Sequence, residues 1–199
     1  MRLYWPVKLR PAFDALFDID DALAAVVERA GEPALAAIKL AWWRERLEEL
    51  DAGTVPAEPR LRAVAADLVP RGIRGNELAE LTESWGTLLG EEPDTKEIAE
   101  GGARLFAIAA RLLGAIDPGI EPAGRLYGHV NAARRGLIAM QPDTHQLRQL
   151  GPHRFPKRLR PLTALAALAA RDARSPRLEA EATPGRSWAL IRHRISGRI

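Results

Sequence analysis

Apolar residues recur every three or four positions through most of this chain, the spacing that places them on one face of a helix. The first such stripe is formed by Phe13, Leu16, Phe17, Leu23 and Val27. Proline and glycine interrupt the pattern at intervals and separate one stripe from the next. The pattern predicts about eight helices, over residues 11–30, 33–51, 57–68, 76–89, 94–113, 122–140, 162–171 and 185–195.

Local signals predict several helix features. Asn76 and Asp94 are predicted N-caps, because each has a side-chain oxygen that can accept from a backbone N–H of the first turn. Gly101 and Gly102 interrupt the fifth helix. We interpret this pair as a surface without side chains against which a neighbouring element packs closely.

A basic loop that contains prolines is predicted over 145–161, with its densest charge at 153–161. Most other connections are short, which favours sequential antiparallel helices in one bundle. No internal repeat or domain boundary is evident. We therefore expect a single domain over 1–199.

Composition supports an all-α fold. Ala and Leu supply 62 of the 199 residues, whereas Val, Ile and Thr supply 25; such a bias favours helices over sheets. The absence of cysteine excludes disulfide frameworks, thiol nucleophiles and Cys-ligated zinc. There is no apolar run of about 18 residues and no secretory signal pattern, so we expect a cytoplasmic protein.

Motif searches argue against several enzyme classes. The four histidines lack the spacing of a metal site, and no serine lies in a nucleophile elbow. Phosphate-binding glycine loops and a dinucleotide fingerprint are also absent. These absences argue against hydrolase triads, P-loop chemistry and nicotinamide binding.

The net charge of +3 hides an asymmetry along the chain. Residues 1–123 contain 14 Lys or Arg and 22 Asp or Glu, whereas 124–199 contain 15 and 4. The basic part suits phosphate groups, and contact with an anionic membrane at its inner face is one interpretation. Its single aromatic in 153–160 forms no stacking platform, so specific nucleic-acid binding is not expected. A background arginine bias without function is the alternative.

Acidic residues cluster on the first predicted helix. Asp14, Asp18 and Asp21 lie within about 60° of one another, opposite the apolar stripe. Three carboxylates so placed could hold Mg²⁺, with Asp18 and Asp21 as the candidate ligands. The alternative is a solvated face with charges favourable for the helix N-terminus.

Asp20 differs because its position falls inside the apolar stripe. A buried carboxylate needs a hydrogen-bond or charged partner. We expect either a structural partner, such as an Arg or a Trp N–H, or a catalytic role. Asp18, Asp20 and Asp21 are thus the catalytic candidates.

The string Leu40-Ala41-Trp42-Trp43-Arg44-Glu45 is the most distinctive in the chain. Adjacent Trp side chains point about 100° apart, so one can enter the core while the other lines a neighbouring surface. Trp43 and Arg44 could bind an anion. The alternative is a core anchor beside an ion pair.

These residues resemble the squalene and phytoene synthase family, in a short and divergent branch. The matching strings are Ala15-Leu16-Phe17-Asp18-Ile19-Asp20, the double-Trp segment, the spacing of Gly124, Asn131 and Arg134, and the C-terminal stretch from Arg186 to His193. The resemblance covers about residues 8–198. It implies an isoprenoid-synthase fold and candidate ligand contacts at Asp20, Trp43, Arg44, Tyr127, Asn131 and Arg134.

Active members of that family join two prenyl diphosphates, using two aspartate-rich motifs that hold Mg²⁺. Here the positions aligned with the first motif are Ala22, Leu23 and Val26, and Arg135 replaces an aspartate of the second. A cation at a metal-ligand position repels Mg²⁺. The pattern resembles the family's non-catalytic complex I assembly factors, in which an acid aligns with Asp20.

Three functions follow as expectations. The first is a non-catalytic protein that binds a prenyl lipid, a prenyl diphosphate or a protein partner, with no cofactor. The second is an active prenyltransferase that uses Mg²⁺ and displaced aspartates. The third is an interaction or assembly factor at a membrane surface.

Overall fold

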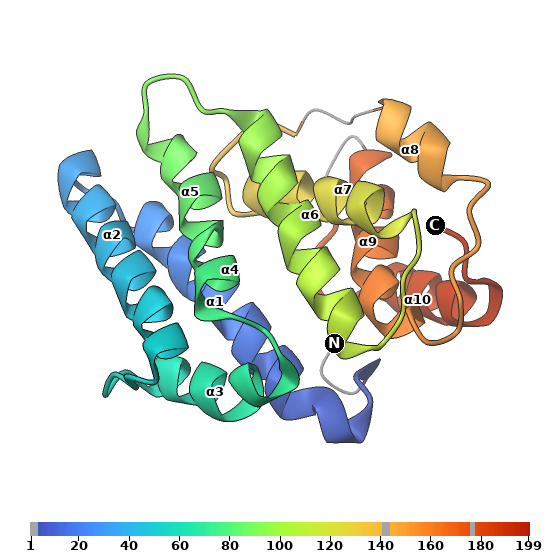
Figure 1. Cartoon of the computed structure of the whole chain (residues 1–199). Coiled ribbons are helices and arrows are strands. Elements are labelled where there is room, and N and C mark those ends of the chain that lie inside the picture. The colour runs from blue at the N-terminus through green and yellow to red at the C-terminus, as the bar shows by residue number, and fades with distance from the viewer. Residues whose placement is uncertain (1–3, 141–143, 176–177) are drawn as a thin grey trace. The chain divides into compact units, whose positions relative to one another are not determined.

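This computed structural model describes residues 4–140, 144–175 and 178–199, and helices are the regular structure found in them (Figure 1). The predicted all-α class is confirmed. No helix within the described residues is both long and apolar enough to cross a membrane. The chain divides into two compact units, Met1–Glu97 and Ile98–Ile199, which we call unit 1 and unit 2. A single domain over 1–199 stays a prediction.

Unit 1 is built on α1 and α2. Its helices are α1 (Arg10–Glu28), α2 (Pro33–Glu49), α3 (Pro59–Asp67) and the short α4 (Gly75–Ala79) and α5 (Leu81–Gly86). Helix α1 packs against α2, α3 and α5, while α2 also packs against α4 and α5. Phe13, Leu16, Ile19 and Leu23 are fully buried on α1. The predicted stripe of the first helix is therefore its core face.

The predicted helix over 76–89 is not one continuous helix in the structure, and its cap differs from the predicted one. It consists of α4, α5 and a 3-10 turn, and the Thr82 hydroxyl donates to the Ala79 carbonyl (2.6 Å) between them. The predicted Asn76 cap is wrong. Instead, the Asp51 carboxylate just beyond α2 accepts from the N–H groups of Gly75 (2.6 Å) and Asn76 (3.0 Å). A cap from a distant residue leaves no local sequence signal.

Unit 2 contains most of α6 (Thr95–Leu112), then α7 (Ile120–Arg134), α8 (Thr144–Leu150), α9 (Arg160–Ala173) and α10 (Pro184–Ser196). Helix α9 packs against both α7 and α10. The predicted Asp94 cap of α6 is confirmed, since its carboxylate accepts from the N–H groups of Lys96 (2.9 Å) and Glu97 (3.1 Å).

The predicted interruption at Gly101-Gly102 is wrong, because α6 is continuous from Thr95 to Leu112, but the predicted close packing is confirmed at Gly102, which lets α6 and α7 approach each other. A Cβ on Gly102 would lie 2.3 Å from the Gly124 carbonyl oxygen and 2.7 Å from the Gly128 Cα. Such distances are far below van der Waals contact, so larger residues would force the two backbones apart.

Two predicted boundaries in unit 2 shift. Helix α7 ends at Arg134 rather than near 140, because Gly136 adopts a φ of 76° and completes a C-terminal Schellman motif with Leu137. The predicted loop over 145–161 contains α8, and α9 begins at Arg160 with Pro161 in its first turn. Proline suits a first turn because that N–H needs no helical acceptor.

Candidate functional site

The acidic face of α1 points away from the core. Asp18 and Asp21 are exposed and Asp14 is half-buried, as the helical spacing predicts. Among the described residues, no group of three or more His, Asp or Glu side chains is arranged to hold a metal ion. The Mg²⁺ interpretation of Asp18 and Asp21 stays a prediction.

Asp20 is buried inside unit 1. Its carboxylate accepts a hydrogen bond of 2.8 Å from the indole N–H of Trp85 on α5. This contact confirms the expectation of a polar partner of the Trp type, and it offsets part of the cost of burying the carboxylate. Asp20 thus joins α1 to α5 and lines neither of the pockets described below.

The two tryptophans of α2 divide as predicted. Trp43 is 8% exposed and belongs to the core, whereas Trp42 is 42% exposed, with the rings edge to face at 5.3 Å. Arg44 forms ion pairs with Glu48 (3.0 Å) and with Glu83 of α5. The hydrogen bond to Glu83, followed by that to Glu48, raises the pKa of Arg44. Arg44 is therefore engaged in a surface network.

A small pocket of about 220 Å³ lies among α1, α2 and α3 beside Trp43. Ala22, Ala25 and Val26 of α1 form its apolar wall, and its cations are Arg29, Lys39 and Arg60. Arg60 pairs with Glu58 (3.1 Å), whereas Arg29 and Lys39 form no ion pair with any described residue. We call this the unit 1 pocket.

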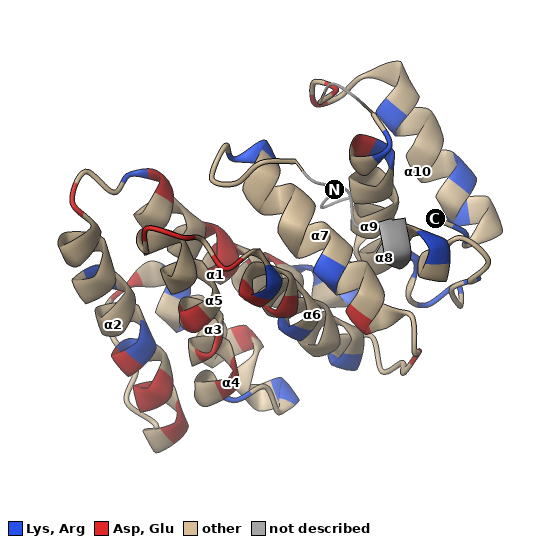
Figure 2. Cartoon of the chain, turned by 90° about the horizontal axis from the view of Figure 1, so that it is seen from above, with Lys and Arg blue, Asp and Glu red and all other residues tan. Residues whose placement is uncertain are grey.

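The side chains that give the unit 1 pocket its charge are basic, whereas unit 1 as a whole is acidic. Unit 1 holds 12 Lys or Arg and 19 Asp or Glu, a net charge of −7, and unit 2 holds 17 and 7, a net charge of +10. Figure 2 shows this division along the helices. Arg29 and Lys39, which have no ion-pair partner among the residues that the structure describes, thus favour an anion within an acidic unit.

The predicted contacts on α7 are tied to neighbouring side chains. The Tyr127 ring packs against Phe106 with centroids 5.2 Å apart, and Asn131 accepts from the guanidinium of Arg135 (3.4 Å). Arg135, which stands where the resembling enzymes carry an acid, is half-buried. These residues form the packed α6 and α7 surface of unit 2.

Arg134 belongs to a charged cluster around Asp172. Asp172 is 1% exposed and accepts from Arg134 (3.0 Å) and from Arg186 (2.7 and 2.9 Å). The exposed Glu181 carboxylate also contacts both arginines. Both terminal nitrogens of Arg134 are hydrogen-bonded within the cluster, which links α7, α9 and α10 and is a structural element of unit 2.

The segment before α10 closes over this cluster. Arg134 donates to the Glu179 carbonyl oxygen, and the Glu179 carboxylate pairs with Arg171 (2.7 Å). The hydrogen bond from Arg171, followed by that from Thr183, lowers the pKa of Glu179. Ala182 adopts a φ of 61°, a left-handed conformation rare for residues other than glycine.

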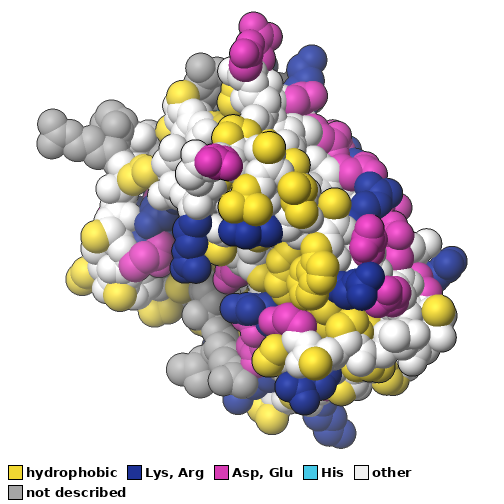
Figure 3. Space-filling model, turned by 90° about the vertical axis from the view of Figure 1, so that its left-hand side faces the viewer, with side chains coloured by type: hydrophobic (Ala, Val, Ile, Leu, Met, Phe, Trp, Pro, Cys, Tyr) yellow, Lys and Arg dark blue, Asp and Glu magenta, His cyan; other side chains and the backbone are white. Residues whose placement is uncertain are grey.

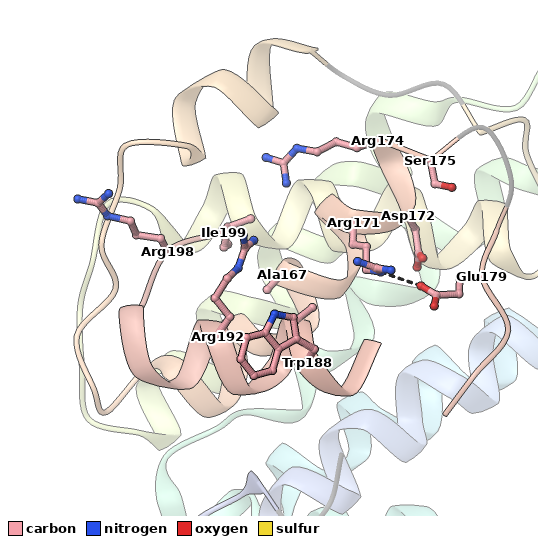
Figure 4. Close-up of a pocket in the computed structure, with 11 residues that line it drawn as sticks. Ala167, Arg171, Asp172, Arg174, Ser175, Glu179, Trp188, Arg192, Arg198 and Ile199 are labelled. Atoms are coloured by element: carbon pink, nitrogen blue, oxygen red, sulfur yellow. Dashed lines mark hydrogen bonds and ion pairs between the residues drawn. The ribbon is translucent and has the colours of Figure 1, made fainter. Parts of the chain in front are cut away.

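A second pocket, of about 440 Å³, lies between α9 and α10 (Figure 4). Its basic and aromatic lining consists of Arg171 and Arg174 from the end of α9, Trp188 and Arg192 from α10, and Arg198 beyond it, and the paired carboxylates of Asp172 and Glu179 also line it. The Arg186–His193 stretch is part of the family resemblance, but its residue pattern predicts no site there. A Trp among arginines in this stretch is a sequence signal for an anion-binding surface. The arginines that α9 adds to the pocket cannot be predicted from the sequence, because they reach it only through tertiary packing.

Comparison of the chain with protein-family models, with curated proteins and with solved structures found no match. The resemblance to squalene and phytoene synthases therefore stays a prediction.

Proposed function

We propose that this protein binds an anionic isoprenoid lipid of the prenyl diphosphate class and does not condense it. The proposal includes an isoprenoid-synthase type of bundle, which rests on the ordered strings of the sequence. The observation that carries it is the unit 1 pocket, where an apolar wall meets two cations that form no ion pair within the described part of the chain.

The chemistry of the unit 1 pocket favours direct contact with a diphosphate. Ala22 and Val26 stand where the resembling enzymes place metal-binding acids, and both line the pocket. Lys39 and Arg29 can contact phosphate oxygens by charge-assisted hydrogen bonds without an intervening metal. The wall of alanine and valine suits the first carbons of a prenyl chain, and about 220 Å³ suits a head group rather than a whole lipid.

Equilibrium binding of farnesyl diphosphate tests the proposal. We expect the same affinity in EDTA and in Mg²⁺, and a loss of about tenfold or more for Lys39→Glu, since each lost charge contact removes on the order of 1.4 kcal/mol or more. Arg62→Glu is the matched control, because Arg62 is an exposed cation of α3 that does not line the pocket. Equal losses for both variants would contradict this site.

Measuring diphosphate release from farnesyl diphosphate distinguishes the non-catalytic proposal from the catalytic alternative. An active Mg²⁺-dependent prenyltransferase would release diphosphate, and Asp18→Ala or Asp21→Ala would abolish that release. We expect no release from the wild-type protein in either EDTA or Mg²⁺. Turnover that depends on these aspartates would overturn the non-catalytic proposal.

A protein-binding role is the second candidate function, and one surface of unit 1 favours it. Leu35, Ile38 and Trp42 form an exposed apolar stripe on α2, and Figure 3 shows hydrophobic side chains gathered on that face among charges of both signs. Mixed charges around an apolar centre are typical of protein interfaces. Ile38→Asp would then abolish capture of the partner while leaving farnesyl diphosphate binding unchanged.

A further inference from the structure

Helix α10 buries polar side chains and exposes apolar ones, the reverse of an ordinary surface helix. Its buried side chains are Arg186 and His193, whereas Trp188, Ile191 and Ile195 are 65%, 46% and 72% exposed. The spacing of 188, 191 and 195 places the three apolar side chains in one stripe. We call this the α10 stripe. Isolated exposed apolar residues are ordinary, but a contiguous stripe that includes Trp marks an interaction surface.

The buried face of α10 is fixed by specific polar contacts. Arg186 binds Asp172, and the His193 ring contacts the Thr163 hydroxyl (2.8 Å) and the Arg198 carbonyl (2.9 Å). Rotating the helix to bury its apolar stripe would leave these groups without partners, at a high cost. Unit 2 therefore holds the α10 stripe outward.

The charged side chains that α10 itself and the residues after it carry are all positive. Residues 184–199 contain four arginines and no Asp or Glu. On a helical wheel Arg192 lies about 40° from Trp188, and Arg194 flanks the opposite side of the stripe. The side chains of Arg192 and Arg198 form no ion pair with any described residue. An occupant of this face is thus expected to be anionic as well as apolar.

The pocket between α9 and α10 adjoins the stripe. Trp188 and Arg192 line it from α10, as Figure 4 shows, and Arg174 lines it from α9 without an ion-pair partner among the described residues. The two carboxylates in the lining, Asp172 and Glu179, are paired with Arg186 and Arg171. The apolar ring beside guanidinium groups that form no ion pair with the described residues therefore matches an amphiphile with an anionic head group.

We propose that α10 docks on an anionic membrane surface. Trp188, Ile191 and Ile195 enter the boundary between head groups and acyl chains, where amphipathic helices lie and where Trp is favoured. Arg192, Arg194 and Arg198 then contact lipid phosphates, and the adjoining pocket receives one head group. The net charge of +10 on unit 2 supplies attraction at longer range.

The charges that flank the α10 stripe favour a lipid surface over a protein as its partner. The stripe on α2 has the same spacing, at 35, 38 and 42, but both acidic and basic side chains flank it. A lipid surface needs only one sign of charge on its partner, and α10 provides only that sign. The α2 stripe therefore serves as an internal control.

Sedimentation with vesicles of phosphatidylcholine, with and without phosphatidylglycerol, tests the proposal on the full chain. We expect binding to the anionic vesicles, and a loss of about tenfold or more when salt rises from about 0.1 M to about 1 M, because the screening length shortens from about 10 Å to about 3 Å. Trp188→Ala and Ile195→Ser should each weaken partitioning about tenfold. Arg192→Glu should weaken binding to anionic vesicles specifically.

Matched variants on α2 complete the test. Ile38→Ser and Trp42→Ala should leave vesicle binding unchanged, and thermal unfolding of all variants should remain near wild type because every site is exposed. Equal binding to both kinds of vesicle, no binding to either, or equal effects of the α2 variants would overturn the proposal. So would a dimer in solution that Trp188→Ala dissociates, since a second copy would then cover the stripe.

This inference is independent of the proposed lipid-binding function. Farnesyl diphosphate binding is measured without vesicles and reports on Lys39, whereas vesicle binding reports on Trp188. Lys39→Glu should leave sedimentation with vesicles unchanged, and Trp188→Ala should leave farnesyl diphosphate binding unchanged. The failure of one proposal can thus be told from the failure of the other.

Discussion

Helices α2 and α10 expose apolar stripes with identical spacing but bury opposite kinds of side chain. Beneath its stripe, α2 buries Ala36, Leu40, Trp43 and Leu47, so this helix is apolar on both sides. Helix α10 buries Arg186 and His193. The first is held in place by packing and the second by charged and hydrogen-bonded groups.

This difference teaches that an exposed stripe does not define its own partner. The flanking charges do so, because they decide which surfaces can approach without unpaired charge at the interface. Around α2 both signs are present, which suits a protein, and on α10 only arginine is present, which suits a lipid surface. The following predictions test whether the two helices are indeed held in different ways.

Removing the buried carboxylate of unit 2 should have the largest effect. Asp172→Ala leaves Arg186 and Arg134 facing a site without their shared acid, and breaking a buried ion pair costs about 3–5 kcal/mol. Urea unfolding with hydrogen exchange of the α9 and α10 amides measures the loss. Glu181→Ala is the control, because Glu181 contacts the same two arginines but is 74% exposed, and we expect a cost of about 1 kcal/mol or less. Equal costs would contradict a charge-held α10.

On α2 the corresponding change is the loss of an apolar side chain. Leu47 is fully buried, so Leu47→Ala removes packing and leaves a cavity at a cost of about 3 kcal/mol. Urea unfolding should show this loss equally at low and high salt, since no charge is involved. Leu35→Ala, on the exposed face, should cost about 0.5 kcal/mol or less. A salt-dependent loss at Leu47 would remove the distinction between the two helices.

The sequence predicts helices well where the signals are local. Proline, glycine and the Asp94 cap mark ends within a few residues, and the prediction over 33–51 agrees closely with α2. Helix α8 was missed because prolines and cations nearby favoured a loop. The predicted helix over 122–140 runs too far, because Gly136 at a φ of 76° ends α7 at Arg134.

The sites were harder to predict because they depend on residues far apart in sequence. A Trp N–H partner for Asp20 was expected, but its identity as Trp85, 65 residues away, needs the tertiary structure. Periodicity also assumes that the apolar face is the buried one. In α10 that assumption fails, because Asp172 and Thr163 of α9 provide partners for polar side chains.

Lowering the pH should reduce the stability of α10 against local unfolding more than that of α2. Burial is the main cause that lowers the pKa of His193 below its usual 6.5, with Arg160 and Arg192 adding to the shift, while the hydrogen bond to the Arg198 carbonyl opposes it. Because the unfolded chain binds the proton more tightly, this stability contribution is intact above pH 6.5 and is lost as pH falls from 6.5 toward the lower folded pKa.

Hydrogen exchange of the α9 and α10 amides between about pH 7 and pH 5 measures this loss, whose slope is at most about 1.4 kcal/mol per pH unit for one proton. His193→Gln should remove that slope, while the α2 amides serve as the internal reference. An unchanged slope in the variant would show that another group titrates.

The smallest expected effect concerns the backbone conformation of the residue that lies two positions before each helix. Helix α2 is entered through Gly31, which is unstrained, whereas α10 is entered through Ala182 at a φ of 61°. A left-handed conformation costs alanine about 1–2 kcal/mol, and glycine loses about 0.5–1 kcal/mol more chain entropy on folding. Ala182→Gly should therefore stabilise unit 2 by about 0.5–1 kcal/mol in urea unfolding. Ala180→Gly, two residues earlier and without a positive φ, should instead be neutral or destabilising, so a gain in both variants would mean that strain at Ala182 is not the cause.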